Sequence, residues 1–251
     1  MPSSGFTVNN TDLDNILVPK SYLIDRYPEL SATYKTAGLW SWGQGTSGQN
    51  GDSGATSRSS PVQTISFSSN WKTVSSGRDH KAAIKTDGTL WLWGLGTSGQ
   101  LGNNAAAAVS SPVQTISAGT NWKQVSCGEG HTGAIKTDGT LWMWGAGTTG
   151  QMGNNAATAR SSPVQTISAG TNWKQVSCGY FSVMAIKTDG TLWGWGGATT
   201  GELGNNVATI NRSSPVQTIA LGSNWKQVSC GKSFSAAVKT DGTLWLWGAN
   251  N

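Results

Sequence analysis

The chain has 251 residues, a formal net charge of +5 and 12% charged residues, and it contains 34 glycines and 14 tryptophans. Glycine and tryptophan replace much of the leucine and isoleucine of an ordinary globular chain, which excludes one large aliphatic core and favours many short strands joined by tight turns. No stretch approaches the ~20 consecutive apolar residues of a membrane span, and we expect no signal peptide because the N-terminus lacks its basic and apolar regions.

Residues 1–30 form the first predicted unit, an arm that docks on a partner or on the rest of the chain. Four of the twelve acidic residues lie there, together with two tyrosines. Charged and aromatic side chains together are typical of a docking segment. The candidate partner-binding residues are Asp12, Asp14, Tyr22, Asp25, Arg26 and Tyr27.

The second predicted unit, residues 31–251, opens with a degenerate copy of the repeat described below. Residues 32–40 resemble residues 82–91, less one residue, and we expect them to include the second strand of that copy. Residues 21–24 are a candidate for its first strand.

A repeat dominates this second unit. Trp40, Trp91, Trp142, Trp193 and Trp245 lie 51, 51, 51 and 52 residues apart. A diverged copy covers 39–89, near-identical copies cover 90–140, 141–191 and 192–243, and a final Leu-Trp-Leu-Trp-Gly stands at 244–248. Self-similarity at such a period is typical of propellers and solenoids.

Each copy contains four short strand candidates, which in one copy are residues 122–128, 132–137, 141–145 and 163–167. Thr-Asp-Gly-Thr joins the second to the third, and Asp-Gly between apolar strands is a strong hairpin signal because glycine accepts positive φ without steric cost. Pro163 opens the fourth candidate. Proline has no N–H for a ladder, so this strand is expected at the outer edge of its sheet.

The third strand indicates how the sheets pack. Alternate residues of a strand face opposite sides, so Trp91 and Trp93 share one face while Leu90 and Leu92 share the other. Both faces are apolar and need a packed layer. Radially stacked four-stranded blades provide two such layers, whereas a sandwich exposes one face. The copies lack the apolar period of a helical solenoid, and their hairpins argue against a parallel β-helix.

Four segments of the repeat resemble a known family. They are Gly-Gln-Leu-Gly at 99–102, Trp-x-x-Val-x-Cys-Gly at 122–128, Gly-His-Thr at 130–132 and Asp-Gly-x-Leu-x-x-Trp-Gly at 138–145. Together they resemble the RCC1 (regulator of chromosome condensation) repeat, over residues 39–251. The resemblance implies an all-β, RCC1-like β-propeller, which in that family usually has seven blades. Here the clear copies indicate four four-stranded blades, and the degenerate copy raises the expected number to five.

The last copy stops after its third strand, which leaves an open edge. Residues 6–8 or 16–18 are available to supply the missing strand, and closure of the ring would remove an edge prone to aggregation. The alternative is an open ring whose copies complete one another, which makes a homo-oligomer.

Enzyme activity is not expected. His80 and His131 share one repeat position, where the later copies have Ser182 and Phe234, so we interpret both as structural. No His and Cys cluster has metal-ligand spacing. The aspartates of the Thr-Asp-Gly turns belong to separate blades, which excludes a close acid–base pair. We therefore predict no catalytic, metal or cofactor site.

Cysteines and lysines also recur at equivalent positions. Equivalent positions in neighbouring blades lie too far apart for a disulfide, so the cysteines are predicted to be buried free thiols in a reducing compartment. The lysines form solvated rings instead of one basic patch, so we do not expect nucleic-acid binding. These residues are Cys127, Cys178 and Cys230, and the lysines at 72, 123, 174 and 226 and at 85, 136, 187 and 239.

Two further features leave alternatives open. The variable loops at 51–58, 104–109, 155–160 and 206–212 are either binding loops or spacers. Ten tryptophans belong to Trp-x-Trp pairs and are expected in the core. The other four, Trp71, Trp122, Trp173 and Trp225, are expected to pack as well, although their exposure would suit a sugar-binding site.

The leading functional hypothesis is a non-enzymatic structural or protein-interaction module within a larger assembly. RCC1-like repeat proteins occur in tailed bacteriophages and bacteria as well as in eukaryotes, and by that analogy we expect protein partners at the tail, fibre or capsid surface of a virion assembled in the host cytoplasm. A cytoplasmic location is the other expectation. The alternative function is a lectin-like propeller for host-surface glycans. The family's exchange-factor or chromatin-binding role has less support, because no insertion between the copies exceeds one residue.

Overall fold

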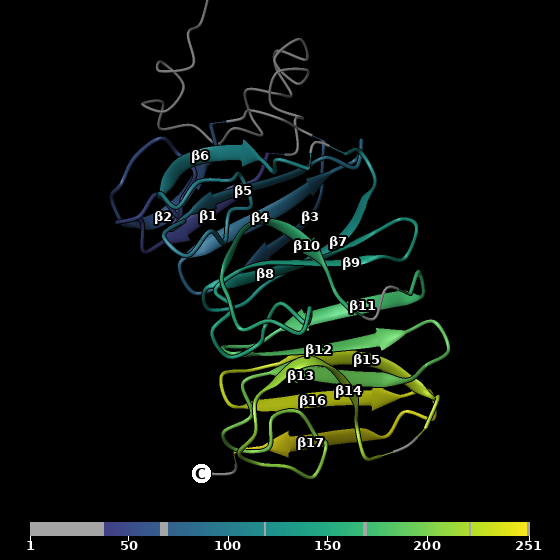
Figure 1. Cartoon of the computed structure of the whole chain (residues 1–251). Helices are drawn as coiled ribbons and strands as arrows, with labels where there is room; N and C mark the ends of the chain where they lie inside the picture. The colour runs from purple at the N-terminus through teal and green to yellow at the C-terminus, as the bar shows by residue number, and fades with distance from the viewer. Residues whose placement is uncertain (1–37, 66–69, 118, 168–169, 221, 250–251) are drawn as a thin grey trace, which may run out of the picture. The chain divides into compact units, whose positions relative to one another are not determined.

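The computed structural model describes residues 38–65, 70–117, 119–167, 170–220 and 222–249 (Figure 1). The chain divides into two units, Met1–Ala37 and Gly38–Asn251, and the structure below is that of the second. None of the described segments is a helix that could cross a membrane. The predicted strands at 6–8, 16–18 and 21–24 lie outside the described residues, as do residues 32–37 of the segment 32–40 and the candidate residues Asp12, Asp14, Tyr22, Asp25, Arg26 and Tyr27.

The described residues form five antiparallel sheets, here called blades 1 to 5. Blade 1 contains β1 (Trp40–Gly43) and β2 (Arg58–Gln63). Blade 2 contains β3 (Trp71–Ser76), β4 (His80–Lys85), β5 (Leu90–Gly94) and β6 (Val109–Gln114). Blade 3 contains β7 (Trp122–Cys127), β8 (His131–Lys136), β9 (Leu141–Gly145) and β10 (Arg160–Gln165). Blade 4 contains β11 (Trp173–Cys178), β12 (Ser182–Lys187), β13 (Leu192–Gly196) and β14 (Arg212–Gln217). Blade 5 contains β15 (Trp225–Cys230), β16 (Phe234–Lys239) and β17 (Leu244–Gly248).

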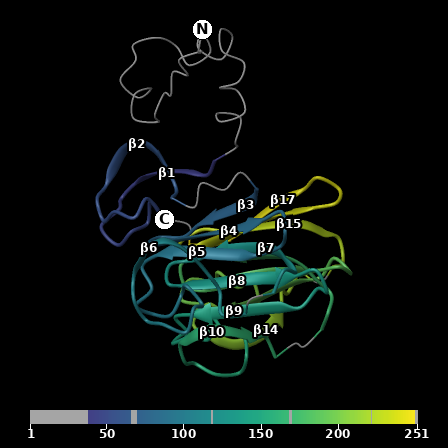
Figure 2. The same ribbon diagram turned by 90° about the horizontal axis from the view of Figure 1, so that it is seen from above.

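The predicted all-β, propeller-type architecture is confirmed, with three complete blades and two partial ones. Within each complete blade the strands lie side by side in chain order, as Figure 2 shows for β7, β8, β9 and β10. The fourth strand is at the sheet edge, as its proline indicated. Its predicted bounds were wrong, however, because β10 begins at Arg160 and Pro163 lies inside it. The register shifts between Arg160 and Val164, and such a bulge accommodates a residue that has no N–H to donate.

The Asp-Gly hairpins form as predicted. Gly88 has φ of 81°, and Asp87 Oδ1 accepts hydrogen bonds from the Thr89 N–H at 2.9 Å and the Thr89 hydroxyl at 2.7 Å. Thr89 Oγ1 in turn accepts a hydrogen bond from Trp91 Nε1 at 2.9 Å. The turn therefore holds the first tryptophan of the next strand in place, and the three later copies repeat the arrangement.

Successive blades are joined by apolar layers, which confirms for blades 2 to 4 that the third strand is packed on both faces. Leu90 and Leu92 of blade 2 pack with Trp122 and Trp144 of blade 3, and all four are at most 1% exposed. Equivalent clusters join blade 3 to blade 4 and blade 4 to blade 5. The hydrophobic core is thus a series of layers between sheets.

The Gly-Gln-Leu-Gly motif receives the tryptophan of the following blade. Gln100 Oε1 accepts a hydrogen bond from the Ser98 N–H at 2.8 Å, which shapes the loop, and the Gln100 carbonyl accepts one from Trp144 Nε1 at 2.8 Å. A Cβ atom on Gly102 would lie 2.8 Å from Trp144 Nε1, so only glycine allows this approach. The motif is therefore a junction between blades.

The tryptophans depart from the prediction at both ends of the blade series. Trp122, Trp173 and Trp225 are at most 2% exposed, which confirms their packing. Of the Trp-x-Trp residues, however, Trp40 is 51% exposed, Trp42 60% and Trp245 44%. These three belong to the partial blades, where the described strands leave one face of the sheet uncovered.

A side-chain amide links the inner strands at two junctions, β7 to β11 and β11 to β15. Gln175 of β11 donates from Nε2 to the Val228 carbonyl of β15 at 3.0 Å and accepts the Val228 N–H at 3.1 Å. Gln124 makes the same pair of bonds to Val176 in the preceding junction. Because one amide pairs both backbone groups of the facing residue, it sets the register of one blade on the next.

Replacing Gln175 with alanine is expected to lower the free energy of unfolding by about 1–3 kcal/mol, because it leaves the buried backbone groups of Val228 unpaired. Gln227 holds the same repeat position in blade 5 and is exposed, so Gln227→Ala should change the free energy by less than about 0.5 kcal/mol. Urea unfolding of both variants measures the difference, and equal effects would contradict the role of the amide.

Candidate functional site

The two histidines lie within the junctions between blades. His80 and His131 are buried, and His80 Nε2 is 2.8 Å from the Thr132 hydroxyl of the next blade. Burial lowers the pKa of His80 to about 3, and electrostatic repulsion by His131 adds to this shift. Burial also lowers the pKa of His131 to about 4. Both side chains are therefore neutral at physiological pH, and this geometry supports the structural interpretation.

The three cysteines are free thiols, as predicted; Cys127 and Cys178 are buried as expected, whereas Cys230 is half-buried. Burial raises the pKa of Cys127 to about 12 and that of Cys230 to about 11, and it raises the pKa of Cys178 strongly. These thiols are protonated at neutral pH and therefore lack the thiolate character of a reactive cysteine. Within the described part of the chain, no group of three or more His, Cys, Asp or Glu side chains could hold a metal ion.

The variable loops attach to the fourth strand of the following blade. The Asn104 N–H donates to the Ser161 carbonyl at 2.9 Å, and the Asn155 N–H donates to the Ser213 carbonyl at 2.8 Å. Asn104 and Asn155 have φ of 63° and 64°, a conformation that asparagine tolerates better than most residues. Of the two alternatives for these loops, the contacts favour spacers that position the next blade.

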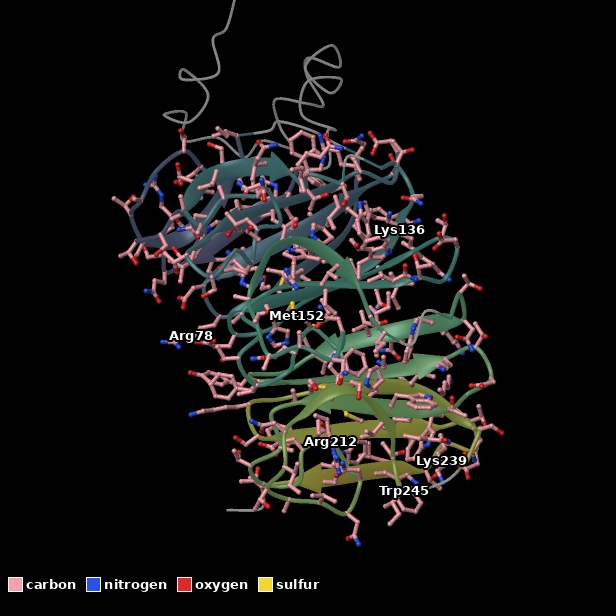
Figure 3. All side chains as sticks on the ribbon, in the orientation of Figure 1. Arg78, Lys136, Met152, Arg212, Lys239 and Trp245 are labelled. Atoms are coloured by element: carbon pink, nitrogen blue, oxygen red, sulfur yellow. The ribbon has the colours of Figure 1, made fainter. Side chains whose placement is uncertain are left out.

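One of the two lysine rings is packed, which corrects the prediction that both are simply solvated. Lys136 Nζ lies 5.0 Å from the Trp122 ring centroid and 4.5 Å from that of Trp142. Lys239 Nζ makes the same pair of contacts with Trp225 and Trp245. Such cation–π contacts hold the charge against the blade. Figure 3 shows Lys136 and Lys239 on one side of the blades and Arg78 on the other.

The strongest candidate site lies at the turns that follow the four inner strands β3, β7, β11 and β15. One repeat position in these turns holds a different charged or aromatic side chain in each blade, although the strand before it is nearly identical from blade to blade. We call this set the turn cluster: Arg78, Glu129, Tyr180 and Lys232.

The members of the turn cluster come from four blades and contact one another. Arg78 Nη1 donates to Glu129 Oε1 at 2.8 Å and to the Tyr180 hydroxyl at 3.1 Å. Lys232 Nζ lies 5.6 Å from the centroid of the Tyr180 ring. Phe181, which is 44% exposed, packs edge-on against Tyr180 with ring centroids 4.5 Å apart. The turns therefore build one continuous surface from residues up to 154 positions apart in the sequence (232 − 78).

The turn cluster surrounds a shallow hollow of about 220 Å³, whose floor is formed by the glycines and cysteines of the same turns. The pKa of Arg78 is raised, first by its electrostatic interaction with Tyr180 and then by Glu129 and Asp79. Two cations, one carboxylate and two aromatic rings at an exposed rim suit the recognition of a protein surface, where tyrosine and arginine often carry the binding energy.

The sequence interpretation missed the turn cluster. Its six candidate residues lie in the arm, outside the described residues. The signal that would have found the turn cluster is divergence between copies, since Arg, Glu, Tyr and Lys occupy one position of a short stretch that varies from copy to copy, while most of the repeat changes little.

The comparison with protein families identifies the repeat from which the blades are built. The model described as the regulator of chromosome condensation (RCC1) repeat matches residues 37–84, 87–135, 138–186 and 189–238, and a second model of that description matches 122–151 and 173–202. The fold and its junctions define a β-propeller protein built from blades of this type. The chain belongs to the RCC1 repeat family.

Among curated relatives, the chain is 32% identical over 213 residues to the ultraviolet-B receptor UVR8 of Arabidopsis thaliana, covering 83% of this chain and 48% of UVR8. It is 29% identical over 180 residues to the E3 ubiquitin-protein ligase HERC2 of Homo sapiens, covering 70% of this chain and 4% of HERC2. The chain thus spans about half of the first relative and a small part of the second.

Two solved structures share the fold. Human WBSCR16 superposes with a TM-score of 0.75 at 22% identity, covering 86% of this chain and 58% of that protein. Yeast RCC1 (Prp20), solved bound to Kap60, superposes with a TM-score of 0.71 at 18% identity, covering 88% of this chain and 55% of that one. At these identities the likeness concerns the fold alone.

Proposed function

We propose that this chain is a non-enzymatic protein-interaction module that works within a larger assembly and binds its partner through the turn cluster. The observation that carries the proposal is the presence of four different charged or aromatic side chains at one position of blades that otherwise share the same strands and turns. Folding alone needs no such variety there, since Arg78 is exposed and Lys232 is exposed as well. Yeast RCC1 was solved bound to a protein, Kap60, which is in keeping with this role for the fold.

Replacement of Arg78, Tyr180 and Lys232 together by alanine is the direct test. Because these side chains lie at an exposed rim, the variant should keep its thermal midpoint and lose its partner. We expect affinity for a protein captured by the wild-type chain from extracts of its source to fall at least about tenfold, the loss typical of hot-spot residues. Biolayer interferometry with the captured protein measures the affinity.

The matched control removes three exposed lysines that also share one repeat position, Lys72, Lys123 and Lys174. It deletes more positive charge than the test variant but leaves the turn cluster intact, and it should bind as the wild type does. If the control loses binding as strongly as the test variant, the interaction depends on general charge and the turn cluster is not the site.

The assembly we propose is a virion, with the chain at the tail, fibre or capsid surface of a bacteriophage. Near-identical repeats and low charge suit a component present in many copies. Mass spectrometry of purified virions from the source should detect the chain at a stoichiometry of several copies per particle, and its absence from intact virions would remove this part of the proposal.

A further inference from the structure

Each of blades 2 to 5 brings two lysines to the end of its sheet that carries the Thr-Asp-Gly-Thr hairpin. In blade 2 these are Lys72, which follows Trp71 at the start of β3, and Lys85, which pairs with Trp71 and ends β4. Figure 3 shows Lys136 and Lys239, the equivalents of Lys85 in blades 3 and 5, on one side of the blades. We call this side the hairpin face; it consists of the two lysine rings and the four hairpins.

The hairpin face carries more positive charge than its own carboxylates balance. Eight lysines and four hairpin aspartates give it a net charge of +4 (8 − 4). Each aspartate is bonded within its own hairpin, as Asp87 is to the N–H and the hydroxyl of Thr89. The salt bridges among the described residues all involve Arg58 or Arg78, so within that part of the chain none of the eight lysines is ion-paired.

One lysine of each pair is held in place by two aromatic rings. Lys85 Nζ lies 5.0 Å from the Trp71 ring centroid and 4.3 Å from that of Trp91. The three later blades repeat this arrangement at 4.9–5.0 Å and 4.3–4.5 Å. A lysine that is already held loses less side-chain freedom when it pairs with an anion. The face therefore presents four positioned ammonium groups, and Lys72 and its equivalents add four exposed ones.

Exposed isoleucines lie at the same end of blades 2 to 4. Three equivalent side chains are more than half exposed: Ile116 (53%), Ile167 (53%) and Ile219 (60%). Each comes two residues after the glutamine that ends the fourth strand, and in blade 2 that glutamine, Gln114, pairs with Trp91, one of the two rings around Lys85. Apolar and positively charged side chains thus alternate from blade to blade on one surface.

We propose that the hairpin face binds an extended acidic segment of a protein partner, whose carboxylates pair with the lysines and whose apolar side chains cover the isoleucines. A nucleic acid fits this face less well. The lysines cover faces of the tryptophan rings on which nucleobases would stack, and the face has no arginine, whose planar fork matches a phosphate group. A phosphate backbone would also leave the isoleucines uncovered.

This inference goes beyond the proposed function, because it concerns a second surface and a second partner. Arg78 of the turn cluster lies on the other side of the blades from Lys136 and Lys239 (Figure 3). The two surfaces can therefore be occupied at the same time, which suits a chain that joins two components of an assembly.

The probe is a fluorescein-labelled peptide, (Asp-Leu-Glu)₄, titrated with the full chain in about 0.15 M salt and followed by anisotropy. Packed sheets lie about 10 Å apart, so four blades extend over about 30 Å, and twelve extended residues reach about 40 Å. We expect saturable binding. The equally charged peptide (Asp-Ser-Glu)₄ should bind about fivefold more weakly, because it leaves the isoleucines uncovered.

The test variant combines Lys72→Ala, Lys123→Ala and Lys174→Ala. All three lysines are exposed and have no ion-pair partner among the described residues, so the variant should fold as the wild type does. Binding of (Asp-Leu-Glu)₄ should weaken about tenfold, the effect expected from the loss of three exposed charge pairs.

The matched control combines Arg78→Ala, Arg160→Ala and Lys232→Ala, which removes the same charge from exposed positions at the other ends of the sheets. Arg160 pairs with Gly145, at the end of blade 3 opposite Lys136. The control should bind the peptide as the wild type does. It lacks two members of the turn cluster, whereas the lysine variant keeps them all, so failure of this proposal and failure of the proposed function give different results.

Three outcomes would overturn the proposal. The first is no saturation by the chain at about 1 mM. The second is an equal loss of affinity in the lysine variant and in the control, which would reduce the binding to the general charge of the chain. The third is tighter binding of a fluorescein-labelled DNA duplex of twelve base pairs than of the peptide in the same salt, which would assign the hairpin face to nucleic acid.

Discussion

Replacing Trp195 with alanine should lower the free energy of unfolding by about 3–5 kcal/mol, the cost of removing a large buried aromatic side chain. Trp195 is fully buried between blades 3 and 4, packs against Trp173 with ring centroids 5.9 Å apart, and donates from Nε1 to the Gln151 carbonyl at 2.9 Å. The substitution therefore removes apolar contacts and leaves a buried carbonyl without its donor. Urea unfolding monitored by circular dichroism measures the effect.

The repeat supplies a matched control. Trp42 holds the same position of the Trp-x-Trp pair in blade 1, but it is 60% exposed. Trp42→Ala should therefore cost less than about 1 kcal/mol, as exposed substitutions usually do. If the two variants lose similar stability, the apolar layers between the complete blades do not hold the fold together in the way described.

The protein should lose stability in mild acid, by about 4 kcal/mol between pH 7.5 and pH 5. The folded-state pKa values of about 3 for His80 and about 4 for His131 lie below the ordinary value of 6.5. Between these values the unfolded chain binds more protons than the folded protein, so this contribution to stability is complete above pH 6.5 and is lost as the pH falls toward 4. At pH 5 the loss is on the order of 2 kcal/mol for each histidine.

The chain itself suggests the control, because its third copy has Ser182 at the position of His131. In His131→Ser the decline in unfolding free energy between pH 7.5 and pH 5 should be about half that of the wild type. Unfolding free energies from urea titrations at the two pH values give this comparison. An unchanged decline would show that the buried imidazole of His131 is not responsible for the acid sensitivity.

Much of the blade was predictable because it depends on local features. Gly88 and Asp87 define a hairpin by their own conformational preferences, and the Leu-Trp-Leu-Trp alternation specifies a strand buried on both faces. The fourth strand was predicted less well. Its proline lies at a bulge between Arg160 and Val164, and a bulge is a property of two paired strands that one strand's sequence does not reveal.

The candidate site was not predicted, for a related reason. Arg78 acquires its partners Glu129 and Tyr180 only when turns 51 and 102 residues apart meet. The candidate residues predicted from the sequence lie in the arm, whereas this site is made by a turn position that differs in every blade. Comparing the copies with one another is the approach that would have identified it.

The sequence by itself determined the RCC1-type repeat, the strands of each blade and the order in which they pair, because alternation and turn chemistry act over a few residues. Only the tertiary structure decided which faces are covered. The same Leu-Trp-Leu-Trp-Gly segment is buried in β5 and largely exposed in β17, because burial depends on what packs against a strand and not on the strand alone.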